Sequence, residues 1–286
     1  MSMKIIMAPL SGVEGGDASL ETALHVGKHF GTHVEAFHAS IDSRDSVAYL
    51  AEGMTSAMIQ DIMNAVEKES GDRTARARAQ FDAACRRAGA TVTKGPSADG
   101  FSASFNAVKG REENLIALRG RLSDLIVAGR REDDDGAARG IIEIALLETG
   151  RPVLVAPPRP ALDFGRVVGV AWNGSAEASR AIASGLPFLR EAEEVIVLVV
   201  PEGARTGPPL DHLIAYLRCH GVTASARHIE ASDKGVGKEI LSQAAAAGID
   251  LLIMGAYTHS RLRHLIFGGA TSAVLDHTNI PVLMAH

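Results

Sequence analysis

The chain repeats itself at about half its length, and this internal repeat limits the folds that it can adopt. Three pairs of segments are alike: residues 124–129 (DLIVAG) and 250–255 (DLLIMG), 152–156 (PVLVA) and 281–285 (PVLMA), and 4–8 (KIIMA) and 167–171 (VVGVA). Residues 157–160, Pro-Pro-Arg-Pro, read as a stiff linker between the two copies. The repeat therefore predicts two tandem domains, residues 1–158 and 159–286.

Short apolar runs alternate with longer helical patterns along both copies. We expect strands at residues 4–8, 34–38, 101–108, 125–128, 153–156, 167–171, 195–200, 223–229, 251–254 and 282–285. We expect helices at 17–30, 46–88 with a break at Gly71, 112–119, 141–147, 175–189, 211–220, 234–247 and 269–276. Strands joined by helices form βαβ units with right-handed crossovers. The predicted fold class is α/β, with two tandem doubly wound parallel-sheet domains that are Rossmann-like and have five strands each.

Composition narrows the class of protein. The 286 residues are 46% hydrophobic and 22% charged, which is typical of a globular protein with room for two domains. A net charge of −5 argues against nucleic-acid binding, which favours a basic surface. No apolar run approaches the roughly 20 residues of a membrane span, and the first residues do not resemble a signal peptide. Cys85 and Cys219 lie in separate helical patterns, so we expect no disulfide and a cytoplasmic location.

The segment from residue 250 to residue 271 has the features of a phosphate cradle. An apolar strand ends at Gly255, and the sequence Gly268-Gly269-Ala270-Thr271 opens the last helix. Glycine allows a ligand to approach the backbone closely, and the free N–H groups at a helix start attract an anion. The loop between them is locally basic and contains His259, Arg261, Arg263 and His264. Arg261 or Arg263 could contact phosphate, but a solvated basic loop is an equally good interpretation.

This glycine pattern resembles the nucleotide-binding loop of the universal stress protein family, whose motif is G-x2-G-x9-G-[ST]. Gly255 and Gly268 take the first and third glycine positions. Thr258 replaces the second glycine, and Gly269 replaces the Ser or Thr. The alternation of strands and helices in both halves also fits this family, so the resemblance covers nearly the whole chain and is to its tandem form. It implies that the ligand is ATP or another adenine nucleotide, with or without Mg²⁺.

Other candidate contacts lie at the ends of the predicted strands. In a doubly wound sheet the ligand lies beyond the carboxyl ends of the strands, where the strand order reverses. The resemblance places Asn173 where the family commonly has an Asp that contacts the ribose or base, and Asn can still donate and accept hydrogen bonds. Asn173 also suits a simple turn before a helix N-cap. The full set of expected nucleotide contacts is Ala171, Trp172, Asn173, Val200, Met254, Gly255, His259, Arg261, Gly268, Gly269, Ala270 and Thr271.

The corresponding loop of the first half departs from this pattern. Aligned on the final strands, Arg139 stands opposite Gly268 and Gly140 opposite Gly269, which makes the loop after Gly129 three residues shorter. This loop carries four adjacent carboxylates, at residues 132–135, which would repel a triphosphate. A solvated acidic run is the better interpretation of them than a metal site. We therefore expect a degenerate site in the first half and one nucleotide per chain, in the second.

The leading hypothesis is a cytoplasmic tandem universal stress protein that binds an adenine nucleotide and has a regulatory role in the stress response. One alternative is an interaction module that binds no nucleotide, which Thr258 and Gly269 favour. The other is an ATP-cleaving or adenylate-forming enzyme, which is disfavoured because no general base or magnesium carboxylate is evident.

In the family the last strand pairs at a sheet edge within a dimer. We therefore expect residues 153–156 and 282–285 to join the halves into an internal pseudo-dimer, with a homodimer as a further option and no nucleic-acid or membrane partner.

Overall fold

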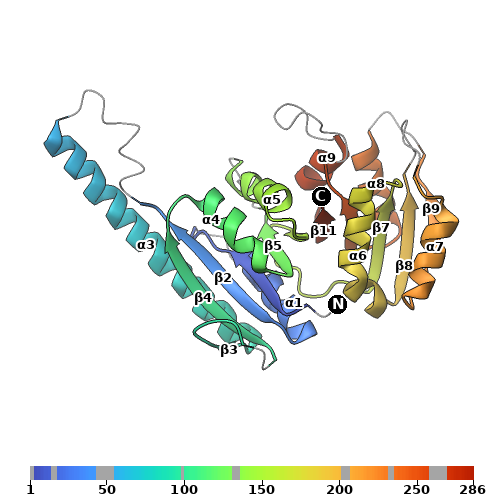
Figure 1. The fold of residues 1–286 in the computed structure, drawn as a ribbon, viewed down its shortest axis with the longest axis horizontal. Coiled ribbons are helices and arrows are strands. Elements are labelled where there is room, and N and C mark those ends of the chain that lie inside the picture. Colours follow the sequence, from blue (N-terminus) through green and yellow to red (C-terminus); the bar gives the residue numbers. More distant parts are fainter. Residues whose placement is uncertain are drawn as a thin grey trace.

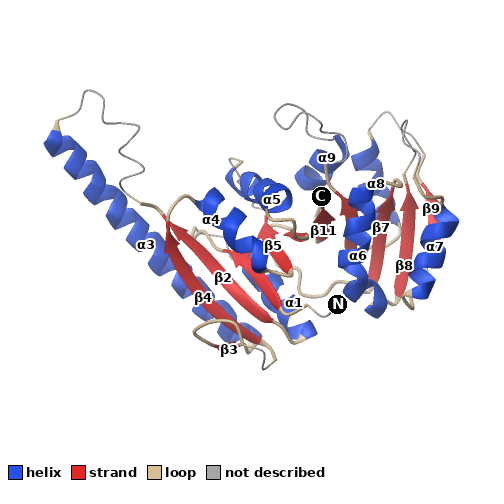
Figure 2. Cartoon of the chain, viewed as in Figure 1, coloured by secondary structure: helices blue, strands red, loops and turns tan. Residues whose placement is uncertain are grey.

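The structure, a computed structural model, describes residues 3–13, 18–42, 55–97, 100–130, 136–200, 207–230, 235–257 and 269–286. Strands and helices alternate along most of the chain (Figures 1 and 2). The first half contains β1 Ile5–Pro9, α1 Ala18–Phe30, β2 His33–Ser40, α3 Ser56–Ala88, β3 Thr91–Val92, β4 Ser102–Lys109, α4 Glu112–Arg119, the 3-10 turn η1 Gly120–Leu122, β5 Leu125–Gly129, α5 Ala137–Glu148 and β6 Val153–Ala156. The second contains β7 Val167–Trp172, α6 Ala176–Glu191, β8 Glu194–Val199, α7 Leu210–Cys219, β9 Ser225–His228, α8 Val236–Ala246, β10 Leu251–Gly255, α9 Gly269–His277 and β11 Val282–Ala285.

The described strands form one 11-stranded sheet in the order β3-β4-β2-β1-β5-β6-β11-β10-β7-β8-β9. Within each half every pair of neighbouring strands is parallel, and the first strand of each half lies inside its part of the sheet. Corresponding strands therefore follow the same order in the two halves. This arrangement confirms the predicted α/β class with parallel sheets and βαβ connections. The proposed division at residues 158 and 159 falls in the connection between β6 and β7.

Helices cover both faces of the sheet and bury two apolar layers. Side chains of α1, α3, α6 and α7 pack on one face, as shown by the buried residues Leu20, Phe81, Ile182 and Leu217. Side chains of α4, α5, α8 and α9 pack on the other face. Neighbouring strand residues alternate between the two layers, which is the period of two that an extended chain imposes. Both layers extend across the two halves.

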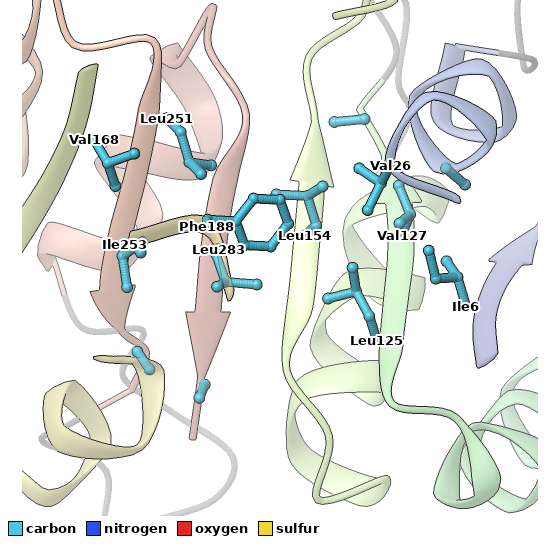
Figure 3. Packing of buried hydrophobic residues seen from close by; sticks show 14 of the residues in the cluster. Ile6, Val26, Leu125, Val127, Leu154, Val168, Phe188, Leu251, Ile253 and Leu283 are labelled. Atoms are coloured by element: carbon cyan, nitrogen blue, oxygen red, sulfur yellow. The ribbon is translucent and has the colours of Figure 1, made fainter. Parts of the chain in front are cut away.

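The two halves meet where β6 pairs with β11, the only antiparallel pair among the described strands. Leu154 stands opposite Leu283 in this register, and both side chains are fully buried. Figure 3 shows the apolar cluster on both sides of this junction. On the same face the rings of Phe30 and Phe188 pack edge to face, with their centroids 5.1 Å apart. The pairing confirms the prediction that the final strands dock the halves within one chain, and it leaves neither strand as an open edge.

The repeated aspartates explain one part of the internal repeat. The carboxylate of Asp124 accepts hydrogen bonds from the backbone N–H groups of Lys4 and Ile5, at 2.7 and 3.0 Å. Asp250 does the same for Gly165, Arg166 and Val167 at the start of β7. Each aspartate therefore ties the beginning of its half's first strand to the strand that pairs with it.

The structure corrects several details of the sequence interpretation. Gly71 does not break the long helix, since α3 is continuous over 33 residues and packs against the sheet through residues such as Ala77 and Phe81. The two-residue strand β3 gives the first half a sixth strand instead of the expected five. Helix α5 begins at Ala137, four residues earlier than expected. Within the described ranges, no helix is both long and apolar enough to span a membrane.

Candidate functional site

The candidate site lies at the carboxyl ends of β7 and β10. These strands are parallel neighbours, with Ala171 opposite Met254, and β8 lies on the other side of β7. The chain leaves β7 toward α6 and β8, whereas β10 lies in the opposite direction, so the strand order reverses between β7 and β10 (Figure 1). This is the place where doubly wound sheets bind their ligands. The carboxyl ends of β7, β8 and β10 therefore lie at one edge of the sheet, whereas the loop at residues 258–268 falls outside the described residues.

Most of the apolar residues that we expected to touch a ligand are core residues. Ala171, Val200 and Met254 are 4–8% exposed and belong to the same buried layer, beneath α8 and α9. Trp172 is 6% exposed and belongs to the layer on the opposite face. Its carbonyl accepts a hydrogen bond from the backbone N–H of Val200 at 2.8 Å, which fixes the ends of β7 and β8 together. These residues form the floor of the site and hold its loops in place.

Asn173 forms a turn that leads into α6. Its side-chain Oδ1 accepts from the backbone N–H of Ser175 at 3.1 Å, and the Ser175 hydroxyl in turn caps α6 by accepting from Ala178 N at 3.1 Å. Gly174, between them, has a φ of +71°. The turn interpretation of Asn173 is therefore confirmed, and the amide Nδ2 is the group that it can offer to a ligand.

Gly255 is explained by packing between a strand and a helix. A Cβ at this position would lie 2.5 Å from the backbone nitrogen of Ala178, in the first turn of α6. Gly129 has the matching position in the first half, where a Cβ would lie 2.9 Å from the Cβ of Ser19 in α1. The same glycine in both copies thus permits the same close contact, and this contact accounts for Gly255 without a ligand.

The start of α9 differs from Gly255 because it is open. Apart from its chain neighbours and the backbone of α9 itself, no heavy atom of the described residues lies within 4 Å of the place that a Cβ on Gly269 would occupy. Ala270 packs against α8, since a Cβ on Gly237 would lie 2.7 Å from the Ala270 carbonyl oxygen. Thr271 is 4% exposed, and its hydroxyl accepts from the backbone N–H of Tyr257 at 3.2 Å. Packing among the described residues therefore explains Gly255, Ala270 and Thr271, but it gives no reason for a glycine at position 269.

Several expected contacts fall outside the described residues. These are His259, Arg261 and Gly268, together with Thr258, Arg263 and His264 and the acidic run at residues 132–135. Their assignment to the site stays a prediction. Among the residues that the structure describes, no group of three or more His, Cys, Asp or Glu side chains could hold a metal ion.

Sequence reasoning missed Tyr257, which follows β10 directly. It is 5% exposed and has a φ of +57°, which is unusual for a residue other than glycine. The centroid of its ring lies 6.4 Å from the centroid of the His286 ring. Burial, and next the negative charge of Glu143 in α5, raise the pKa of the Tyr257 phenol. Nothing in the sequence Ala-Tyr-Thr marks this backbone conformation, which fixes the exit from β10 next to the other half.

Comparisons with known proteins agree with this geometry. The family model described as "Universal stress protein family" matches residues 166–286. A curated universal stress protein of Synechocystis sp. is 63% identical over 35 residues, so the match spans 12% of this chain and 12% of that protein.

Solved structures give the same result for the fold. The crystal structure of a universal stress protein from Archaeoglobus fulgidus has a TM-score of 0.68 at 14% identity, over 100% of this chain and 99% of that one. A putative universal stress protein from Pseudomonas aeruginosa has a TM-score of 0.55 at 14% identity, over 99% and 93%. At this identity the likeness concerns the fold alone, and it extends over both halves.

Proposed function

We propose that this chain, whose second half belongs to the universal stress protein family, binds one adenine nucleotide in that half as a regulatory ligand in the cytoplasm. The nucleotide would lie across the carboxyl ends of β7 and β10. ATP is our first choice, with or without Mg²⁺. The nucleotide would act as a regulatory ligand, and no step of the proposal requires chemistry on it.

The observation that carries this proposal is the open first residue of α9. Gly269 begins a nine-residue helix at the point where the strand order reverses, and in the described part of the chain no side chain or neighbouring element lies against the place of its missing Cβ. The backbone N–H groups of a first helical turn have no partner within the helix, and the helix dipole favours negative charge there. A phosphate group can approach such a start closely only if the side chain is absent.

The neighbouring residues suit the rest of a nucleotide. The Asn173 amide lies on the loop after β7, where it can donate to a ribose hydroxyl or a base through Nδ2. Ala171, Val200 and Met254 close the floor with apolar side chains. We assign phosphate contacts to His259, Arg261 and Gly268, which carry over from the glycine pattern.

Two matched valine variants test this proposal. Gly269→Val places a branched side chain in the proposed phosphate cradle, whereas Gly140→Val makes the same change at the corresponding position of α5. At neither glycine does another described element place a heavy atom within 4 Å of the position that a Cβ would occupy, so both variants should fold. Calorimetric titration with ATP should show lost binding in Gly269→Val and unchanged binding in Gly140→Val. Equal affinities in both variants would show that phosphate does not bind at α9.

The second candidate function is an interaction module without a nucleotide. It is favoured by two hydrogen bonds, because the Asn173 Oδ1 and the Thr271 hydroxyl already accept from backbone N–H groups of the protein. Mass spectrometry of small molecules released from the purified, denatured protein separates the two functions. A nucleotide in stoichiometric amount supports the first, and a blank that persists after incubation with ATP supports the second.

A further inference from the structure

The first half contains a small pocket at the carboxyl ends of β1 and β5. Its volume is about 110 Å³, and its lining includes Ser11, Ser19, Arg73, Glu112, Gly129 and Arg130. These residues come from the loop after β1, the first turn of α1, the long helix α3, the first turn of α4 and the end of β5. The pocket therefore lies where the strand order of the first half reverses, between β1 and β5.

Helix α3 narrows this pocket. Gly12 in the loop after β1 has a φ of +70°, and a Cβ there would lie 2.3 Å from the carbonyl oxygen of Arg73. Arg76 Nε donates to the Gly12 carbonyl at 3.1 Å, and Gln80 Nε2 donates to that of Val13 at 2.8 Å. Pockets for drug-sized ligands have about 300–1,000 Å³, so this one is too small for a nucleotide.

The polar groups of the pocket are not paired with one another. Ser19 is 5% exposed, and its hydroxyl has no hydrogen-bond partner among the described residues. Within the same ranges, no ion pair joins Arg73 to Glu112 or to any other carboxylate. Arg130 is committed elsewhere, since its guanidinium donates to the carbonyl oxygens of Thr278 and Asp276 at 2.7 Å. The Ser19 hydroxyl and the half-buried Arg73 guanidinium thus line one cavity without a partner among the described residues, and a ligand in the cavity could supply hydrogen bonds to both.

We propose that this pocket binds a small oxyanion, of the size of inorganic phosphate or a short carboxylate. The Arg73 guanidinium supplies the charge, and the hydroxyls of Ser11 and Ser19 donate to the remaining oxygens. Burial raises the pKa of Glu112, although the charge of Arg73 opposes this shift. The Glu112 carboxyl lines the same pocket, and its negative charge, when it is ionised, would oppose the anion. The first half would thus keep a ligand site, but for a smaller ligand than the nucleotide proposed for the second half.

Titration with two probe anions in the Gly269→Val background tests this site, because that change blocks the proposed phosphate cradle of the second half. Calorimetry with inorganic phosphate and with acetate should show one saturable site per chain for at least one anion. The anion that binds more tightly shows whether the site prefers a tetrahedral oxyanion, such as phosphate, or a planar one, such as acetate. Absence of saturable binding by both anions would overturn the proposal, whatever the outcome for ATP.

Substitutions then locate the anion. Arg73→Gln should weaken binding by about tenfold to a hundredfold, since it removes a charge-assisted contact. Arg86→Gln on the exposed face of the same helix is the matched control and should bind normally. Ser19→Ala keeps the Cβ that faces Gly129 and should weaken binding several-fold with little effect on thermal unfolding, whereas Glu112→Gln should not weaken it. Equal affinities in Arg73→Gln and Arg86→Gln would overturn the proposal.

Discussion

Arg139 of α5 donates to the carboxylate of Asp276 in α9 at 2.7 Å, and this contact ties the first half to the second. The same guanidinium donates to the Ser272 hydroxyl at 2.6 Å and to Glu143 of its own helix at 3.0 Å. Arg130 adds contacts to two carbonyl oxygens at the end of α9. The helix whose first residue we assign to phosphate binding is therefore held, through its other residues, by the opposite half of the chain.

The first prediction concerns this contact. Arg139→Met keeps the aliphatic packing but removes the charge and leaves Glu143, which is 20% exposed, without its cation. We expect the free energy of unfolding to fall by about 1.5–3 kcal/mol, measured by urea denaturation. Arg166→Met is the control, because its ion pair with Glu193 is exposed and should not change the midpoint measurably. A similar effect in both variants would contradict a specific role for Arg139.

The second prediction concerns the strand junction. Leu283→Glu places a carboxylate opposite Leu154 in a fully buried position, which should cost on the order of several kcal/mol. We expect the halves to separate or the protein to aggregate, measured by small-angle scattering and size-exclusion chromatography. Leu147→Glu, at a side chain that is 45% exposed, should leave the scattering profile unchanged. Separate halves in the unmodified chain would contradict the junction itself.

The third prediction distinguishes packing glycines from the proposed ligand glycine. Gly255→Ala and Gly129→Ala force a Cβ to within 3 Å of the first turns of α6 and α1, so each should destabilise the protein by about 1–3 kcal/mol. Gly269→Ala places its Cβ away from every other described element and replaces glycine in a helix, so it should not destabilise the protein. Thermal unfolding of the three variants measures this order, and the reverse order would refute our assignment.

The fourth prediction concerns alkaline pH. Because burial raises the pKa of Tyr257 in the folded state, the unfolded chain loses this proton first as the pH rises. The stability that depends on the neutral phenol is complete below the ordinary tyrosine pKa of about 10 and is lost above it. Tyr257→Phe should therefore show a smaller fall in its urea midpoint between about pH 9 and about pH 11 than the unmodified protein. Tyr216→Phe, at a residue that is 40% exposed, should retain the original pH dependence.

The sequence predicted the elements whose pattern is unambiguous. The runs after Pro152 and Pro281 gave β6 and β11 their observed bounds, because a four-residue apolar stretch after proline has few alternatives to a buried strand. Gly71 misled the prediction, since packing of the rest of α3 outweighs the small cost of one glycine. The strand at Thr91–Val92 is exposed and carries no apolar alternation to mark it.

The candidate site was harder to predict, for physical reasons. A motif cannot distinguish a glycine that admits a ligand from one that admits a neighbouring helix, and the close contact with α6 is by itself enough to require Gly255. No local pattern marks the positive φ of Tyr257, and the charges of Glu143 and Arg139 that act on its phenol come from the other half of the chain. The pocket around Arg73 and Glu112 joins residues from five separate segments, and its size follows from the path of α3.

The stoichiometry of ATP binding to the unmodified chain tests the central claim most directly. Isothermal titration should give one site per chain, because only the second half combines an open glycine start with a family match, whereas the first-half pocket is too small for a nucleotide. Two equal sites per chain, or no binding at millimolar ATP, would contradict it.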